Sequence, residues 1–275
     1  MRPLKFFITF LLILSIPAFC FSQDIIQNIG EGHINWTKKI ARAKGIGAPS
    51  RSQMGLPSAR PLAIRAAKLD AYRNLLEAVK GIRVDASTVI TNYSTSDDVI
   101  MTKVGGMIKG AKVIKLEYMS DGTVEVTVEM DLNKGFSQLV LPQDIKQVTI
   151  VKPMVANNVN AEGFFSGLIV DARGLGVRPA MAPKILDENQ KEVYGSAFVS
   201  REFAVQQGMC GYVKDPGAAK ANKRVKGNAL FVKGIKSMGP GKSNIVISNA
   251  DAAKLRSSSK HLSFLRECRV IIIVD

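Results

Sequence analysis

Apolar and charged side chains alternate along two neighbouring segments in the first half of the chain, residues 114–118 and 124–130. An alternation with a period of two is typical of a strand that buries one face and exposes the other. Asp121 and Gly122 lie between the two segments and favour a turn. The pattern therefore predicts a β-hairpin.

The register of this hairpin follows from the same alternation. A two-residue turn would set Tyr118 opposite Glu125 and mix apolar with charged side chains on one face, which the period of two forbids. A three-residue loop at residues 120–122 sets Tyr118 opposite Val124 and keeps each face uniform. This loop predicts a left-handed backbone conformation at Gly122.

A period of three to four residues begins after Ser58 and predicts a long helix. Pro61 falls in the first turn, where proline is tolerated, and Gly81 fits a C-terminal cap. We expect the helix to bury one apolar stripe, which consists of Leu62, Ala66, Leu69, Tyr72, Leu76 and Val79.

Weaker patterns complete the first unit, which we assign to residues 31–140. Residues 33–43 alternate loosely and residues 84–94 are rich in Val, Ile and Thr, so both segments predict strands. Ser96 fits the start of a shorter helix. Together these elements predict one or two helices on a small antiparallel sheet whose other face is wet.

The second unit, residues 150–275, is less regular and follows a polar stretch that marks the boundary near residue 150. Its final strand is a continuous apolar run, which predicts burial on both faces, and a capping box at Ser248 and Asp251 opens the helix before it. A strand, that helix and the final strand would form a right-handed crossover. The expected elements are strands at 167–170, 230–235, 244–247 and 270–274, a hairpin joining 184–187 with 192–194, a helix at 250–257, a turn region at 174–183 and a basic surface loop at 214–228.

These elements predict an α+β fold. A helix-on-antiparallel-sheet N-terminal domain is followed by a second α/β-type domain with a mixed sheet. The length of 275 residues and the hydrophobic content of 46% are ordinary for two globular domains.

Residues 1–22 are typical of a secretory signal peptide, because a charged start precedes an apolar run from Phe6 to Ile16. This run is shorter than the roughly 20 residues that cross a bilayer. We expect cleavage after Ser22, and lipid attachment at Cys20 is the alternative. The sequence thus predicts an extracytoplasmic protein, periplasmic or associated with the outer membrane, without a transmembrane span after signal removal.

The chain is strongly basic, with a net charge of +15 and a pI of about 9.8. Such a charge favours acidic partners. Outside the cytoplasm these are envelope proteins, an anionic membrane surface or an anionic wall polymer, and we expect no nucleic acid partner.

Signal removal leaves two cysteines, Cys210 and Cys268. An oxidising compartment permits a disulfide between them. Two separately buried thiols fit the sequence equally well.

Motifs for catalysis or metal binding are weak. Residues 239–243 resemble the end of a phosphate-binding loop, but Lys236 stands where the first glycine is required, so a hairpin turn is favoured. His33 and His261 are far apart in sequence and neither belongs to a ligand-spaced pair. We therefore expect no catalytic residues, no metal site and no cofactor.

The most unusual polar cluster follows the strand at 167–170 and begins with Asp171 and Arg173. Two residues apart on a strand share a face, so these side chains predict an ion pair that anchors the glycine turn after them. The alternative is a ligand site in which Arg173 and Arg178 hold an anionic molecule.

The segments ARPLAIRAAKLDAYRNLLEAVKGIRVDA and GAKVIKLEYMSDGTVEVTVEMDL resemble the Lpp-twenty family of envelope lipoproteins, whose domain recurs in flagellar assembly proteins P and T. The resemblance covers about residues 33–132. It implies a non-enzymatic domain associated with the outer membrane or the periplasm, in some cases with the flagellum.

The sequence thus favours a non-enzymatic, extracytoplasmic structural or assembly protein of the cell envelope, linked to the outer membrane or the flagellar basal body. The alternative is a periplasmic binding module, or a hydrolase with weak motifs, that takes an anionic ligand at the glycine turn after Asp171.

Overall fold

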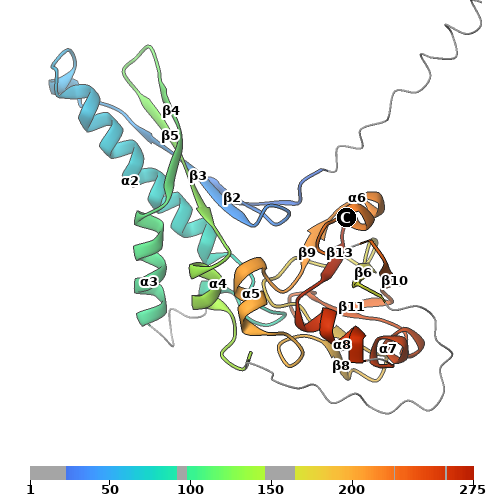
Figure 1. Ribbon diagram of the computed structural model, residues 1–275. Coiled ribbons are helices and arrows are strands. Elements are labelled where there is room, and N and C mark those ends of the chain that lie inside the picture. Colours follow the sequence, from blue (N-terminus) through green and yellow to red (C-terminus); the bar gives the residue numbers. More distant parts are fainter. Residues whose placement is uncertain (1–22, 92–97, 146–164, 226, 258) are drawn as a thin grey trace, which may run out of the picture.

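The computed structural model describes residues 23–91, 98–145, 165–225, 227–257 and 259–275 (Figure 1). The expected signal peptide, its cleavage site, Cys20 and the expected boundary near residue 150 lie outside these ranges. The described residues form an α+β fold with two units, as the sequence predicts.

The N-terminal unit is a five-stranded antiparallel sheet with the strand order β1-β2-β3-β5-β4. Helix α2 crosses one face of this sheet, and α3 and α4 lie beside it (Figure 1). The strands are β1 (Ile26–Ile29), β2 (Gly32–Asn35), β3 (Ile40–Gly47), β4 (Lys112–Tyr118) and β5 (Val124–Asp131), and the helices are the 3₁₀ turn η1 (Arg51–Gln53), α2 (Ala59–Lys80), α3 (Asp98–Lys109) and α4 (Gly135–Val140).

The β4–β5 hairpin confirms the derived register. Tyr118 pairs with Val124, Leu116 pairs with Val126, and Gly122 has a φ of +85°. The register shifts between Val113 and Lys115, a bulge that the alternation did not predict.

The face of the sheet opposite α2 is wet, as expected. Its charged side chains pair across and along the strands, because Arg42 Nε lies 2.6 Å from Glu129 and Lys44 Nζ lies 2.7 Å from Glu125. These partly exposed pairs contribute little to stability.

Helix α2 is confirmed, but the expected buried stripe is only partly correct, because Val79, Tyr72 and Leu76 pack in or against the core whereas the N-terminal part of the stripe is exposed. The fully buried side chains of the helix are mostly alanines, namely Ala63, Ala67, Ala71 and Ala78, together with Leu75 and Val79. Alanines are needed because strand β3 passes very close to α2. A Cβ on Gly45 of β3 would lie 2.0 Å from the backbone nitrogen of Ala71. Leu62 and Leu69 of the expected stripe are 41% and 59% exposed.

Two expected strands of this unit are wrong in detail. Residues 33–43 form two strands, β2 and β3, joined by a turn in which Lys39 has a φ of +56°. The described part of residues 84–94 forms a loop with an isolated bridge between Arg83 and Val89. The Asp85 carboxylate accepts hydrogen bonds from the backbone of Ser87 and Thr88, which stabilises a turn there.

The C-terminal unit contains two four-stranded sheets. A parallel sheet has the order β10-β6-β13-β9, and a mixed sheet has the order β11-β12-β7-β8. The strands are β6 (Gly167–Asp171), β7 (Ile185–Leu186), β8 (Glu192–Tyr194), β9 (Gly211–Val213), β10 (Ala229–Lys233), β11 (Lys236–Met238), β12 (Asn244–Val246) and β13 (Val270–Ile273), and the helices are α5 (Arg201–Gln207), α6 (Pro216–Ala221), α7 (Asn249–Arg256) and α8 (Ser259–Arg266).

Several expectations for this unit are confirmed. Strand β13 lies between β6 and β9 with every residue buried, and β7 pairs with β8 as a hairpin. The Ser248 hydroxyl accepts the backbone N–H of Asp251 at the start of α7. Residues 239–243 are the turn between β11 and β12.

Two other expectations are wrong. Strands β12 and β13 belong to different sheets, so the crossover through α7 does not form within one sheet. Residues 214–228 are not simply a basic surface loop, because they contain α6 and because the Arg224 guanidinium donates to interior carbonyl groups.

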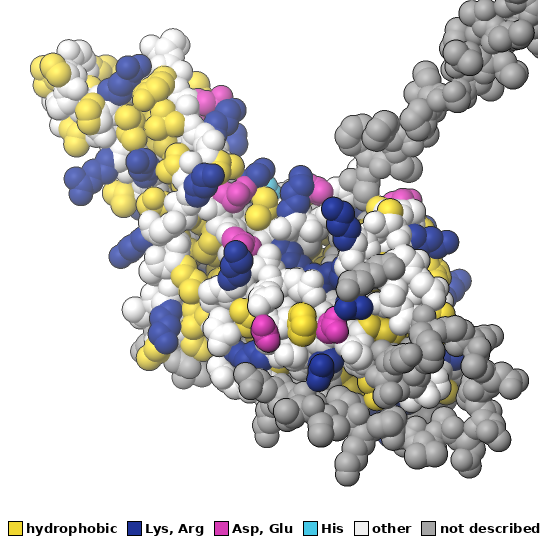
Figure 2. Space-filling model, in the orientation of Figure 1, with side chains coloured by type: hydrophobic (Ala, Val, Ile, Leu, Met, Phe, Trp, Pro, Cys, Tyr) yellow, Lys and Arg dark blue, Asp and Glu magenta, His cyan; other side chains and the backbone are white. Residues whose placement is uncertain are grey.

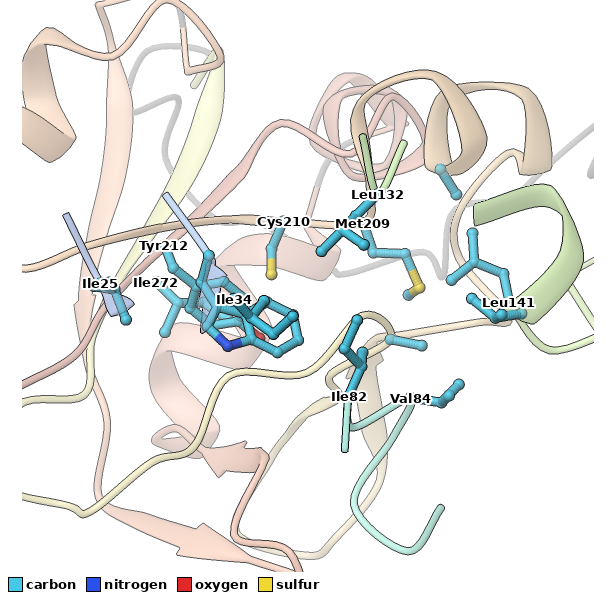
Figure 3. Packing of buried hydrophobic residues seen from close by; sticks show 14 of the residues in the cluster. Ile25, Ile34, Ile82, Val84, Leu132, Leu141, Met209, Cys210, Tyr212 and Ile272 are labelled. Carbon is cyan, nitrogen blue, oxygen red and sulfur yellow. The ribbon is translucent and has the colours of Figure 1, made fainter. Parts of the chain in front are cut away.

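The two units share one hydrophobic core. Figure 3 shows Ile34 and Ile82 of the first unit packed among Met209 and Tyr212 of the second, within one cluster of buried residues. Tyr212 also contacts Trp36 edge to face, with 5.9 Å between the ring centres. We conclude that the units form a continuous interior rather than two independent cores.

Backbone hydrogen bonds join the units as well. The N–H groups of Met181 and Ala182 donate to the carbonyls of Arg83 and Val84 over 3.0 and 2.7 Å, respectively. The N–H of Gly241 donates to the carbonyl of Ala86 over 2.7 Å. The loop at residues 83–86, expected to be a strand, is therefore an attachment point for the second unit.

Candidate functional site

The glycine turn after β6 was the alternative ligand site, and there Asp171 and Arg173 pair with each other. Arg173 Nε and Nη2 donate to the two carboxylate oxygens of Asp171 over 2.8 and 2.6 Å. The Arg173 side-chain hydrogen bond is the main cause that lowers the pKa of Asp171. This two-point pair is the ion pair that the sequence favoured.

Two backbone N–H groups of this turn are also bonded within the chain. The Gly174 N–H donates to the Asp275 carboxylate over 2.9 Å, and the Arg178 N–H donates to the carbonyl of Lys242 over 3.0 Å. The Arg178 side chain is exposed. The ligand interpretation requires that Arg173 be available to bind an anion. In the structure the Arg173 guanidinium is instead paired with Asp171.

A second cluster of ionisable groups surrounds the end of α5, where sequence reasoning placed no site. Lys39 Nζ donates to the carbonyl of Gln207 over 3.0 Å, and Arg224 donates to the carbonyls of Gln207, Gly208 and Cys268. Carbonyls at a helix C-terminus carry partial negative charge and favour cations. We interpret both cations as caps of this helix end.

This arrangement also fixes the conformation at Gly208. Its φ is +74°, and a Cβ there would lie 1.8 Å from Lys39 Nζ, so only glycine fits. Burial, followed by repulsion from Arg224, lowers the pKa of Lys39 to about 8.

The two cysteines lie beside this cluster as free, buried thiols. Burial raises the pKa of both, that of Cys268 to about 11. A thiol is a nucleophile only when it is deprotonated. These cysteines therefore have the properties of structural residues.

The interior next to Lys39 leaves room for little more than one water molecule. The cavity there measures about 10 Å³ and is lined by Trp36, Leu132, Ser137 and Tyr212 among others. Pockets for metabolites are roughly 300–1,000 Å³. This junction is therefore packed rather than shaped for a substrate.

Neither metal chemistry nor membrane crossing finds support in the described ranges. They contain no group of three or more His, Cys, Asp and Glu side chains that could hold a metal ion. His33 is half-buried on β2 opposite Arg42, and the side chain of His261 lies outside the described part of the chain. Within the same ranges, no helix is both long and apolar enough to cross a membrane.

The tip of the N-terminal unit exposes large apolar side chains. We define the tip as the loop before α2 together with the end of the β4–β5 hairpin, residues 49–60 and 118–122, which line one open hollow of about 400 Å³. The exposed fractions are 57% for Met54, 53% for Leu56, 49% for Tyr118 and 46% for Met119. Such a cluster on a surface is typical of an interaction site.

Two contacts hold the parts of the tip together. The Arg60 guanidinium carbon lies 4.1 Å from the centre of the Tyr118 ring, a cation–π contact that joins α2 to the hairpin. Gly122 packs beside Pro49, since a Cβ on this glycine would lie 3.4 Å from the proline ring. The tip is therefore an ordered surface rather than two separate loops.

An outer stripe of α2 continues this apolar surface along the helix. Leu62, Ala66 and Leu69 are exposed, whereas Tyr72 and Leu76, further along the same face, pack against the core. Helix α3 contacts α2 and reaches only part of its length (Figure 1). In Figure 2 hydrophobic side chains gather on the arm formed by α2 and the hairpin, with basic side chains around them.

The α2 side of this arm is basic, whereas the β4–β5 hairpin carries more acidic than basic side chains. The segment from η1 to the end of α2 carries six basic and two acidic side chains, namely Arg51, Arg60, Arg65, Lys68, Arg73 and Lys80 against Asp70 and Glu77. Exposed apolar groups flanked by excess positive charge fit an acidic amphipathic partner better than a neutral one. The sequence carried a signal for this surface, since the exposed leucines belong to the stripe that we expected to be buried.

Comparison with known families overturns the expected resemblance. The family model that matches is the second domain of Treponema pallidum Tp0624, over residues 167–275, and not the Lpp-twenty family or the flagellar P and T families. The resemblance rested on the pattern of a helix packed on a hairpin, and this pattern does not identify a family because many unrelated α+β domains share it.

The match begins at the first residue of β6 and covers the sheets and helices of the C-terminal unit. No curated protein matches the chain. The comparisons thus identify a similarity of the C-terminal unit to the second domain of Tp0624, over less than half of the chain.

Proposed function

We propose that this chain is a non-enzymatic, extracytoplasmic structural or assembly protein that attaches to another component of the cell envelope through the tip and the outer stripe of its N-terminal unit. The exposed apolar side chains of the tip are the observation that carries this proposal.

The projection of the N-terminal unit from the rest of the molecule supports the proposal. One continuous core runs through both units, and the N-terminal end of α2 extends away from the C-terminal unit as an arm (Figure 1). Exposed apolar side chains cost free energy in water, about 1.5–3 kcal/mol for each large one relative to full burial. Burying the tip against a partner would recover part of this cost.

The chemistry of the interior also supports a binding role. Lys39 and Arg224 cap a helix end, and Asp171 and Arg173 neutralise each other. Each of these groups has a structural explanation that needs no substrate. The extracytoplasmic location rests on the signal-like pattern of residues 1–22.

The test is co-sedimentation of the mature chain, from Gln23 onwards, with envelope fractions of the cells that produce it. A tip variant, Tyr118→Ser with Met119→Ser, should bind at least about tenfold more weakly, because two exposed apolar contacts are lost. The matched control, Phe231→Ser with Ile235→Ser, removes two exposed apolar side chains from the C-terminal unit, which are 41% and 46% exposed.

Circular dichroism and thermal unfolding would confirm that both variants are folded. Equal envelope binding by the wild type and the tip variant, or equal losses in the tip and control variants, would refute the proposed attachment surface.

A further inference from the structure

We propose that the occupant of the tip is an anionic lipid bilayer surface, into which Met54, Leu56, Tyr118 and Met119 insert while Arg51 of η1 and Arg65 of α2 contact lipid headgroups. This inference deepens the proposed function and rests on it, since it names the envelope component that the tip binds.

The shape of the tip is the first argument. Its exposed apolar side chains lie on two loop ends at the extremity of a projecting arm, so they can enter a flat surface together (Figure 1). Two of them are methionine and leucine on a loop, and the others are a tyrosine and a methionine at a hairpin end. Tyrosine suits the boundary between headgroups and acyl chains, because its ring is apolar and its hydroxyl is polar.

The distribution of charge is the second argument. Arg51 lies within the tip and Arg65 follows it in α2; both are exposed, and the segment from η1 to the end of α2 has an excess of four positive charges. Each basic side chain near an anionic leaflet strengthens binding roughly fivefold. Apolar insertion and headgroup contact would therefore act together, as in other surface-bound proteins.

A second copy of this chain is a poorer occupant. Two arms in contact through their α2 sides would bring together two segments of excess positive charge, which repel each other across an interface. The hollow at the tip is open, so it does not enclose a ligand as a binding pocket does. Asp121 of the hairpin borders it.

Vesicle co-sedimentation tests the inference with defined lipids. The mature chain should bind vesicles that contain phosphatidylglycerol far more tightly than vesicles of phosphatidylcholine alone, and added salt should weaken this binding. Met54→Ser with Leu56→Ser should reduce the partition coefficient at least about tenfold. Arg51→Gln with Arg65→Gln should reduce it about 30-fold on the anionic vesicles.

The control for charge is Lys233→Gln with Lys236→Gln, which removes two exposed cations from the C-terminal unit. The inference requires that this control bind nearly as well as the wild type. An equal loss in the control would overturn it, because the binding would then depend on net charge alone.

Failure of the inference can be distinguished from failure of the proposed function. Envelope binding that needs the tip, without binding to either kind of vesicle, would overturn the lipid surface and leave a protein or wall polymer as the partner. Tip-dependent self-association in analytical ultracentrifugation without vesicle binding would overturn it in favour of a second copy. A wild-type chain that binds neither envelope fractions nor vesicles would overturn both proposals.

Discussion

Replacing Lys39 by methionine should stabilise the protein near neutral pH. Burial lowers the pKa of Lys39 from its usual value of 10.5 to about 8. This difference means that holding the ammonium charged in the folded state costs about 3 kcal/mol. Methionine has a similar length and no charge, so Lys39→Met removes this cost.

The variant also loses one hydrogen bond, from Lys39 Nζ to the carbonyl of Gln207. That carbonyl keeps a donor in Arg224, so the loss is limited to about 1 kcal/mol. The positive φ of Lys39 affects lysine and methionine alike. At about pH 7 the free energy of unfolding should therefore rise by about 2 kcal/mol.

The sign of the pH dependence follows from the same shift. Because the folded state binds this proton more weakly than the unfolded state, the wild type gains stability as pH rises from about 8 towards 10.5. The advantage of Lys39→Met should shrink over this window and vanish or reverse above it.

Urea unfolding of both proteins at neutral pH and at about pH 10 measures this difference. The control is Lys38→Met, since Lys38 is 61% exposed in a surface pair with Asp24 and should change stability by less than about 1 kcal/mol. A Lys39→Met variant that is less stable than the wild type at neutral pH, or a difference that is independent of pH, would refute the reasoning.

Three further predictions concern the fold. Gly45→Ala should destabilise the protein by more than about 3 kcal/mol in urea unfolding, because the new Cβ would overlap the backbone of α2, whereas Gly106→Ala, which meets open space on α3, should stabilise it by about 0.5–1 kcal/mol. Asp187→Asn should cost about 3 kcal/mol at neutral pH, because it leaves the half-buried Arg256 without its carboxylate. Burial raises the pKa of Asp187, but hydrogen bonds from Arg256 and from the backbone of Lys191 and Asn189 together lower it below its usual value of 3.8, so this contribution should decline as pH falls through the folded-state pKa, and a cost that grows towards acid pH would contradict the assignment. Alkylation of Cys268 should be far slower in the folded protein than in urea, as mass spectrometry can show, because burial raises its pKa to about 11; rapid labelling of the folded chain would contradict its burial.

The hairpin shows how far local pattern alone determines structure. Its register and the left-handed Gly122 follow from the need to keep apolar and charged side chains on separate faces, which is a property of neighbouring residues. The capping box at Ser248 and the fully buried strand β13 are of the same kind. The fold class and the strong basic charge were likewise available from the sequence.

Tertiary structure decided which face of α2 is buried. The sequence offers two stripes on this helix, one of large apolar residues and one of alanines, and hydrophobicity favours the first. The alanine stripe is buried because Gly45 and Gly47 bring the strand so close to the helix that only small side chains fit. That choice depends on a contact between segments that the helix sequence does not encode.

One candidate site could be predicted from the sequence, and the others depend on tertiary contacts. The ion pair of Asp171 and Arg173 was predictable, because two residues of one strand share a face. The cluster of Lys39 and Arg224 was not, because residues far apart in the chain meet only at the end of α5. The exposed tip was hidden for the same reason, since nothing local shows that α3 covers only part of α2 and leaves the rest of its apolar stripe in water.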